Sequence, residues 1–166
     1  MRSALPIVAW MSAWLLAVAP IVAVAEVAGG AHTVIEARDL HADAGRVERD
    51  GVAILLMFSA QHCGYCARVR EEFLLPMASG TAYAKKVIIR ETRVDDPRPL
   101  RDFDSQPVLP RDLAWRYDVS LTPTILFLDG RGRELTKRIV GLGTPDFFGL
   151  YLDAAIDQAR ATLNSP

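Results

Sequence analysis

Two segments of strand length mark the predicted centre of the fold. Residues 52–58 are apolar throughout, which is typical of a strand buried on both faces, and residues 86–94 predict a second buried strand. Between them, residues 67–78 alternate apolar and charged positions at helical spacing. They predict an amphipathic helix that begins near Cys63 and is bent or ended at Pro76. A right-handed parallel crossover would join these elements into one strand, helix, strand unit.

Further elements are predicted on both sides of this unit. Residues 37–48 and 111–117 each predict a short helix, the first packed at the edge of the domain. Residues 124–128 predict a strand, and the glycine-rich turn at 129–132 leads to a paired strand over 134–140. The chain is therefore expected to form one α/β domain, a central mixed β-sheet flanked by helices.

The last predicted element is a helix that starts after Thr144 and Pro145 and ends near Leu163. Residues 95–110, which contain four prolines, predict a long loop. The expected buried stripe of the last helix consists of Phe147, Leu150, Tyr151, Ala154, Ala155 and Ala159.

The first 25 residues differ from the rest of the 166-residue chain. Arg2 is their one charged side chain, and the apolar run that follows ends at Ala23-Val24-Ala25. This pattern is typical of a secretion signal, with residues 26–166 as the domain that remains. A retained membrane anchor is the alternative, because residues 3–24 carry no charge and roughly 20 apolar residues span a bilayer. Either interpretation predicts that the domain works outside the cytoplasm.

The charge balance excludes one class of partner. The chain has 19 basic and 20 acidic side chains and a formal net charge of −1, with no basic run and no alternation of aromatic and arginine residues suited to stacking bases. Nucleic acid is therefore not expected to bind.

The candidate chemistry lies at Cys63 and Cys66, the only cysteines, where the first buried strand leads into the helix. Thiol–disulfide exchange needs an attacking thiolate and a second thiol near enough to resolve the mixed disulfide. At the first turn of a helix, the pKa of the Cys63 thiol should fall from about 8.5, so Cys63 is the expected nucleophile. Cys66, the less exposed of the two, is the expected resolving thiol.

Other uses of the two cysteines remain open. A structural disulfide closing so short a loop would stabilise little, and a zinc site would need four ligands. Cu(I) accepts two thiolates, so a copper-delivery module is a second class of function, and a redox-inert assembly partner is a third. No bound cofactor is needed for the redox interpretation.

The chain resembles the thioredoxin superfamily over residues 39–161. The resemblance is carried by the strand ending Met57-Phe58-Ser59-Ala60, the Cys63-Gly64-Tyr65-Cys66 motif, Thr122-Pro123-Thr124 before a strand, and the Gly130 hairpin leading to Gly141. It implies a thioredoxin fold in which Pro123 follows a cis peptide bond opposite the cysteines and the backbone at Thr122 pairs with substrate. Gly64 and Tyr65 would complete the active-site motif, and Tyr65 is expected to contact partner proteins.

Within the superfamily, the sequence is most similar to exported bacterial proteins of the SoxW type, at residues 55–58, at Asp102-Phe103-Asp104, and at Tyr117 followed by residues 121–124. That resemblance implies an exported oxidoreductase, which we expect to be periplasmic and monomeric. It would reduce disulfides of exported proteins and be recharged by a membrane thiol donor. The Gly64-Tyr65 pair also resembles disulfide isomerases of the DsbC type, so an oxidase or isomerase is the alternative.

Four positions depart from the thioredoxin pattern. Tyr65 stands where ordinary thioredoxins have proline between the cysteines, so the resemblance does not by itself imply thioredoxin's reducing power. His62 replaces the usual tryptophan, and it either stabilises the Cys63 thiolate or occupies an exposed rim. The family's buried aspartate and its partner lysine align with Met57 and Glu91. Our hypothesis is that Glu91 lies under Cys66 and accepts its proton; the alternative is a solvated strand residue.

Overall fold

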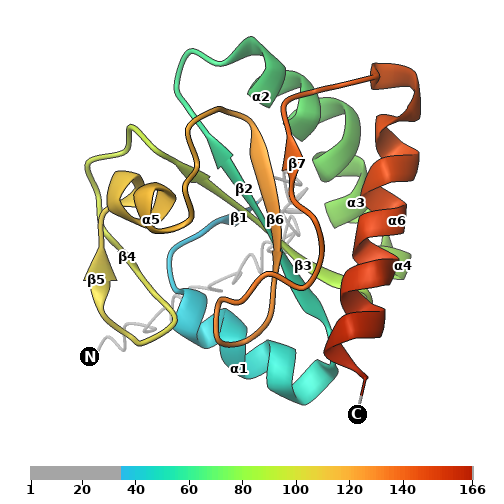
Figure 1. The fold of residues 1–166 in the computed structure, drawn as a ribbon, viewed down its shortest axis with the longest axis horizontal. Coiled ribbons are helices and arrows are strands. Elements are labelled where there is room, and N and C mark those ends of the chain that lie inside the picture. The colour runs from blue at the N-terminus through green and yellow to red at the C-terminus, as the bar shows by residue number, and fades with distance from the viewer. Residues whose placement is uncertain (1–34, 166) are drawn as a thin grey trace, which may run out of the picture. The chain divides into compact units, whose positions relative to one another are not determined.

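The computed structural model describes residues 35–165, so the predicted signal segment and its possible anchor lie outside the described residues. A five-stranded mixed sheet with the order β1-β3-β2-β6-β7 forms the centre (Figure 1). Its strands are β1 (Ile35–Glu36), β2 (Ala53–Ser59), β3 (Val87–Arg93), β6 (Thr124–Leu128) and β7 (Ile139–Val140). The helices are α1 (Leu40–Asp50), α2 (Gly64–Val69), α3 (Leu75–Ser79), α4 (Thr81–Ala84), α5 (Pro110–Arg116) and α6 (Pro145–Leu163).

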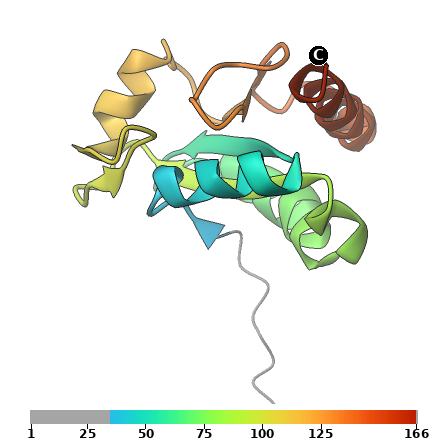
Figure 2. The same cartoon turned by 90° about the horizontal axis from the view of Figure 1, so that it is seen from below.

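Strand β2 is the central strand, as its continuous apolar run predicted. All seven of its residues are buried; it pairs in parallel with β3 and antiparallel with β6. Because side chains alternate across a strand, Leu55 and Met57 enter one core and Leu56 and Phe58 the other. The first core lies under α2, α3 and α6, and the second lies under α1 and α5 (Figure 1 and Figure 2).

Helix α1 begins and ends with standard caps. The side chain of Asp39 accepts the Ala42 N–H at 2.8 Å at the start of the helix. Gly51 ends it in the left-handed conformation, at φ +63°, and leads into β2. The predicted helix at residues 37–48 is thus present but shifted by three residues at its start.

The helix that follows the cysteines is interrupted before Pro76. After α2, the backbone makes a π-helical turn, η1 (Arg70–Leu74), and then continues as α3 with Pro76 in its first turn. A proline lacks the N–H that an α-helix needs and its ring crowds the carbonyl of the preceding turn, so the widened turn accommodates it. The predicted bend is therefore a π turn placed one turn earlier than the proline.

Two predictions for the second half of the chain need correction. The strand expected over residues 134–140 reduces to β7 and an isolated bridge between Leu128 and Glu134, because the chain bends at residue 136 between them. The Arg138 guanidinium donates to the Tyr117 carbonyl at 2.6 Å. The expected loop at residues 95–110 contains a small hairpin, β4 (Leu100–Arg101) and β5 (Pro107–Val108). The Asp102 carboxylate holds it by accepting two backbone N–H groups within the turn.

The buried stripe of helix α6 shares Ala159 and the partly buried Ala155 with the expected one but otherwise differs from it. Phe148, Leu152, Ile156 and Ala159 pack into the core, while Phe147, Leu150 and Tyr151 are more than half exposed. Both sets have helical spacing, so only packing against the sheet decides between them. None of the helices formed by residues 35–165 is long and apolar enough to cross a membrane.

Candidate active site

The two cysteines lie at the carboxyl end of β2, where the chain turns into α2 (Figure 1). They form a disulfide with a Cα to Cα distance of 5.2 Å. Cys63 has an extended backbone and is the N-cap of α2, whereas Cys66 belongs to the first turn. The structure thus places the pair at the predicted junction between strand and helix.

The cap geometry gives the Cys63 sulfur a hydrogen-bond donor. The backbone N–H of Cys66 donates to the Cys63 Sγ at 3.1 Å. The N–H groups at the start of a helix have no partner within it and carry the positive end of the helix dipole, so this position favours a thiolate once the disulfide is reduced. Cys63 is partly exposed and Cys66 is fully buried. A partner can therefore reach Cys63 first.

The Thr122-Pro123 segment faces the exposed sulfur. The peptide bond between these residues is cis. The Thr122 hydroxyl donates to the Cys63 Sγ at 3.6 Å, and the Thr122 carbonyl oxygen lies 3.7 Å from the same sulfur. The fold therefore brings Thr122 and Cys63 together across the β2–β6 pairing.

Exposed groups surround the disulfide. Tyr65 and Leu121 are each 63% exposed, and a Cβ at Gly64 would meet no atom within 4 Å. His62 is also exposed, as the rim interpretation expects, and the structure records no hydrogen bond between it and Cys63. Partners therefore have an open approach to the disulfide, flanked by an aromatic and an aliphatic side chain.

Glu91 is buried on β3, directly beside Met57 of β2, so the interpretation as a solvated residue is wrong. The Ser59 hydroxyl donates to its carboxylate at 2.5 Å. The Arg70 guanidinium donates twice, from Nε at 2.7 Å and from a terminal nitrogen. The hydrogen bond to Glu91 raises the pKa of Arg70. Both carboxylate oxygens thus have partners, and within residues 35–165 none of these hydrogen bonds comes from Cys66.

Sequence reasoning missed Ser59 and Arg70. Arg70 comes four residues after Cys66, a spacing that places two helical residues on one face. That spacing was the available signal that Arg70, like Cys66, faces the sheet. Its partner on β3 follows only from the register that sets Glu91 beside Met57.

The described part of the chain offers no cluster of metal-ligating side chains beside the two cysteines. Among residues 35–165, no group of three or more His, Cys, Asp or Glu side chains is arranged to hold a metal ion. The copper interpretation therefore depends on the two cysteines alone.

Comparisons with known proteins agree with this geometry. A family model described as a thioredoxin-like domain matches residues 40–156. The solved structure of wild-type poplar thioredoxin h is 20% identical, with a TM-score of 0.52 over 74% of this chain and 97% of that one. A mutant of the same poplar protein is 18% identical, with a TM-score of 0.53 over 76% of this chain and 87% of that one. No curated protein matches the sequence. The fold expected from the sequence resemblance is confirmed.

Proposed function

The chain belongs to the thioredoxin-like domain family, and from this premise we propose that it is an exported thiol–disulfide oxidoreductase that reduces disulfides in other exported proteins. One observation carries the proposal. The disulfide-bonded pair has a partly exposed Cys63 at the N-terminus of α2 and a buried Cys66 one turn inside. This asymmetry suits an attacking thiol and a resolving thiol.

The proposed cycle transfers two electrons. The Cys63 thiolate attacks one sulfur of the partner's disulfide; a bond forms between them, and the partner's second sulfur leaves as a thiolate and takes up a proton. Cys66 then loses its proton and attacks the Cys63 Sγ. The Cys63–Cys66 disulfide forms, and the partner's first sulfur leaves as its second thiol. An external dithiol must then reduce the pair again.

The site geometry favours both steps. The Cys66 N–H and the Thr122 hydroxyl both donate to the Cys63 sulfur, so they stabilise the thiolate that attacks in the first step. Because Cys66 is fully buried, other disulfides do not reach it directly. The second step is therefore intramolecular, and the mixed disulfide should be short-lived.

The setting of this activity is part of the proposal. Support for export comes from the sequence of residues 1–25, which has the pattern of a secretion signal. We place the domain in the periplasm as a monomer recharged by a membrane thiol donor. The SoxW-like residues at Asp102-Phe103-Asp104 and around Thr122 support that assignment.

Turnover of a protein disulfide tests the proposal. The protein from residue 26 onward should reduce many equivalents of a disulfide substrate when a dithiol supplies electrons. Cys63→Ser should abolish turnover, whereas Cys66→Ser should accumulate a mixed disulfide at Cys63. A wild-type protein without turnover, or one that retains stoichiometric copper through gel filtration instead, would contradict the proposal.

A further inference from the structure

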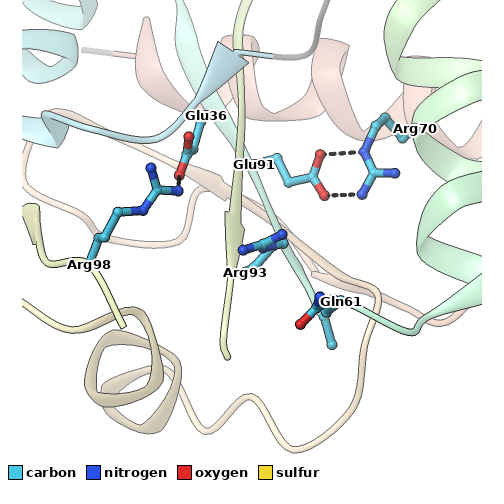
Figure 3. Close-up of a pocket in the computed structure, with 7 residues that line it drawn as sticks. Glu36, Gln61, Arg70, Glu91, Arg93 and Arg98 are labelled. Atoms are coloured by element: carbon cyan, nitrogen blue, oxygen red, sulfur yellow. Dashed lines mark hydrogen bonds and ion pairs between the residues drawn. The ribbon is translucent and has the colours of Figure 1, made fainter. Parts of the chain in front are cut away.

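A cavity of about 340 Å³ (Figure 3) is lined in part by Ala60 and Gln61, which lead into the disulfide loop. It sits where β2 and β3 end, because the last residues of the two strands, Ser59 and Arg93, are paired in register. Gln61 lines it and is two residues from Cys63, so their Cα atoms are at most about 7 Å apart. The lining residues are Glu36, Ala60, Gln61, Arg70, Glu91, Arg93 and Arg98.

Two of the three lining arginines have carboxylate partners. Arg70 forms the paired hydrogen bonds with Glu91 described above. Arg98 donates to Glu36 at 2.9 Å and to Asp96 at 2.6 Å. Their charges are therefore compensated within the protein.

The third arginine, Arg93, forms only two long ion pairs, with Asp95 and Asp96. Its nearest carboxylates, those of Asp95 and Asp96, are 3.9 and 3.7 Å away. Each has a closer donor, the Gln61 N–H for Asp95 at 2.8 Å and Arg98 for Asp96. Within residues 35–165 the structure records no hydrogen bond from the Arg93 guanidinium, which lies between the two ion pairs in Figure 3. Arg93 thus lines the cavity with guanidinium N–H groups that make no hydrogen bond within the described residues.

The chemistry of these donors selects an anion. A guanidinium offers a planar fork of N–H groups that matches a carboxylate, and Gln61 adds an amide at the cavity wall. The volume equals that of roughly ten water molecules in the liquid, which leaves room for an acidic side chain. We propose that the cavity binds a carboxylate of the disulfide-bearing partner and so favours substrates with an acidic residue near the reacting cysteine. This proposal rests on the function proposed above.

Matched peptide substrates test it. Every peptide contains one intramolecular disulfide, and the two peptides of a pair differ only in having Glu or Gln at one position. A series of pairs places this position at increasing distance from the cysteines, on either side of them. At the best position and at low ionic strength, the kcat/KM of the wild type should be about three- to fivefold higher for the Glu peptide than for the Gln peptide. In high salt the two kcat/KM values should become equal. Arg93→Gln should bring the ratio of kcat/KM for the Glu peptide over the Gln peptide to about one, and Arg93→Lys should retain part of the preference for Glu.

Arg131 provides the control, because it follows the β6 strand at the opposite end of the sheet from Cys63. Arg131→Gln should leave both the ratio and the turnover of the Gln peptide unchanged. Equal kcat/KM for Glu and Gln at every position in the wild type, or a ratio that survives Arg93→Gln, would overturn the proposal.

A binding experiment that needs no turnover distinguishes failure of this proposal from failure of the proposed function. If neither peptide is reduced, the oxidoreductase proposal fails, and peptides with serine in place of both cysteines still report on the cavity. The Glu peptide should shift the NMR amide signals of Ala60 and Gln61 at lower concentration than the Gln peptide does. If acetate shifts these signals while the two peptides behave alike, the cavity takes free anions only and the proposal is wrong.

Discussion

The hydroxyl of Thr122 donates a hydrogen bond to the sulfur of Cys63 at 3.6 Å, across 59 positions of sequence. The contact exists because β6 pairs antiparallel with β2, with Thr124 opposite Phe58. The start of one strand thereby lies at the end of the other. A residue remote in sequence thus contacts the sulfur that we propose as the nucleophile.

Removing this hydroxyl should weaken the Cys63 thiolate. Thr122→Val preserves the shape of the side chain but deletes the donor, so the pKa of the Cys63 thiol should rise by about half a unit in the reduced protein. The ultraviolet absorbance of the thiolate, followed against pH, measures this. Thr162→Val, at the far end of α6, serves as the control and should leave the titration unchanged. If the Cys63 thiol has the same pKa in the Thr122 variant as in the wild type, the contact does not stabilise the thiolate.

Replacing Glu91 tests whether the buried carboxylate accepts the Cys66 proton. Glu91→Gln keeps the volume but removes the base, so resolution of the mixed disulfide should slow by about tenfold or more. Glu72→Gln is the matched control, because Glu72 pairs with Arg68 on an exposed helical surface. Rapid-mixing experiments on folded variants measure the rate. If the Glu91 and Glu72 variants resolve equally fast, Glu91 is a structural partner of Arg70 only.

Neighbouring phenylalanines on α6 should differ sharply in their effect on stability. Phe148 is 1% exposed within the core, whereas Phe147 is 53% exposed. Phe148→Ala should lower the free energy of unfolding by about 3–5 kcal/mol, because it opens a cavity in the core. Phe147→Ala should change it by about 0.5 kcal/mol or less. Urea unfolding of both variants decides this, and similar losses would refute the assignment of the buried face.

Acid should destabilise the turn after β6 through Asp129. Burial alone raises the pKa of this carboxyl, but hydrogen bonds from the Arg133 and Arg131 N–H groups and the Arg133 guanidinium outweigh it and hold the pKa below its usual value. The stabilisation is therefore complete above the unfolded pKa of about 3.9 and is lost as the pH falls through the lower folded value.

Asp129→Asn keeps the acceptor oxygen but removes the titrating charge. Between about pH 5 and pH 3, the wild type should lose more unfolding free energy than this variant, by an amount on the order of 0.5 kcal/mol after solvent screening. Urea unfolding at several pH values measures the difference. Parallel losses in the two proteins would show that Asp129 does not contribute to acid sensitivity.

The main features of the fold and the reactive pair were predictable from the sequence, because each depends on local pattern. The continuous apolar run of β2 indicates a strand covered on both faces, and a Cys-x-x-Cys motif directly after it implies the helix N-terminus. Burial of Cys66 and partial exposure of Cys63 follow from their positions on the first turn.

Features that depend on pairing between distant segments were not predictable in the same way. Helical spacing fits Phe147 as well as Phe148, so only contact with the sheet identifies the buried stripe. Asp102 organises a hairpin through hydrogen bonds to nearby backbone, which leave no periodic pattern. Arg70 pairs with Glu91 because β2, β3 and η1 converge, and a single sequence carries no signal of that convergence.

The reduction potential of the Cys63–Cys66 pair is the most direct test of the proposed reductase function. It can be measured by equilibrating the protein from residue 26 onward with a dithiol buffer of known potential and quantifying the free thiols. We predict a value near that of thioredoxin, about −270 mV, which favours electron transfer to the disulfides of other proteins. A value of about −120 to −180 mV would contradict this account and identify an oxidase or isomerase instead.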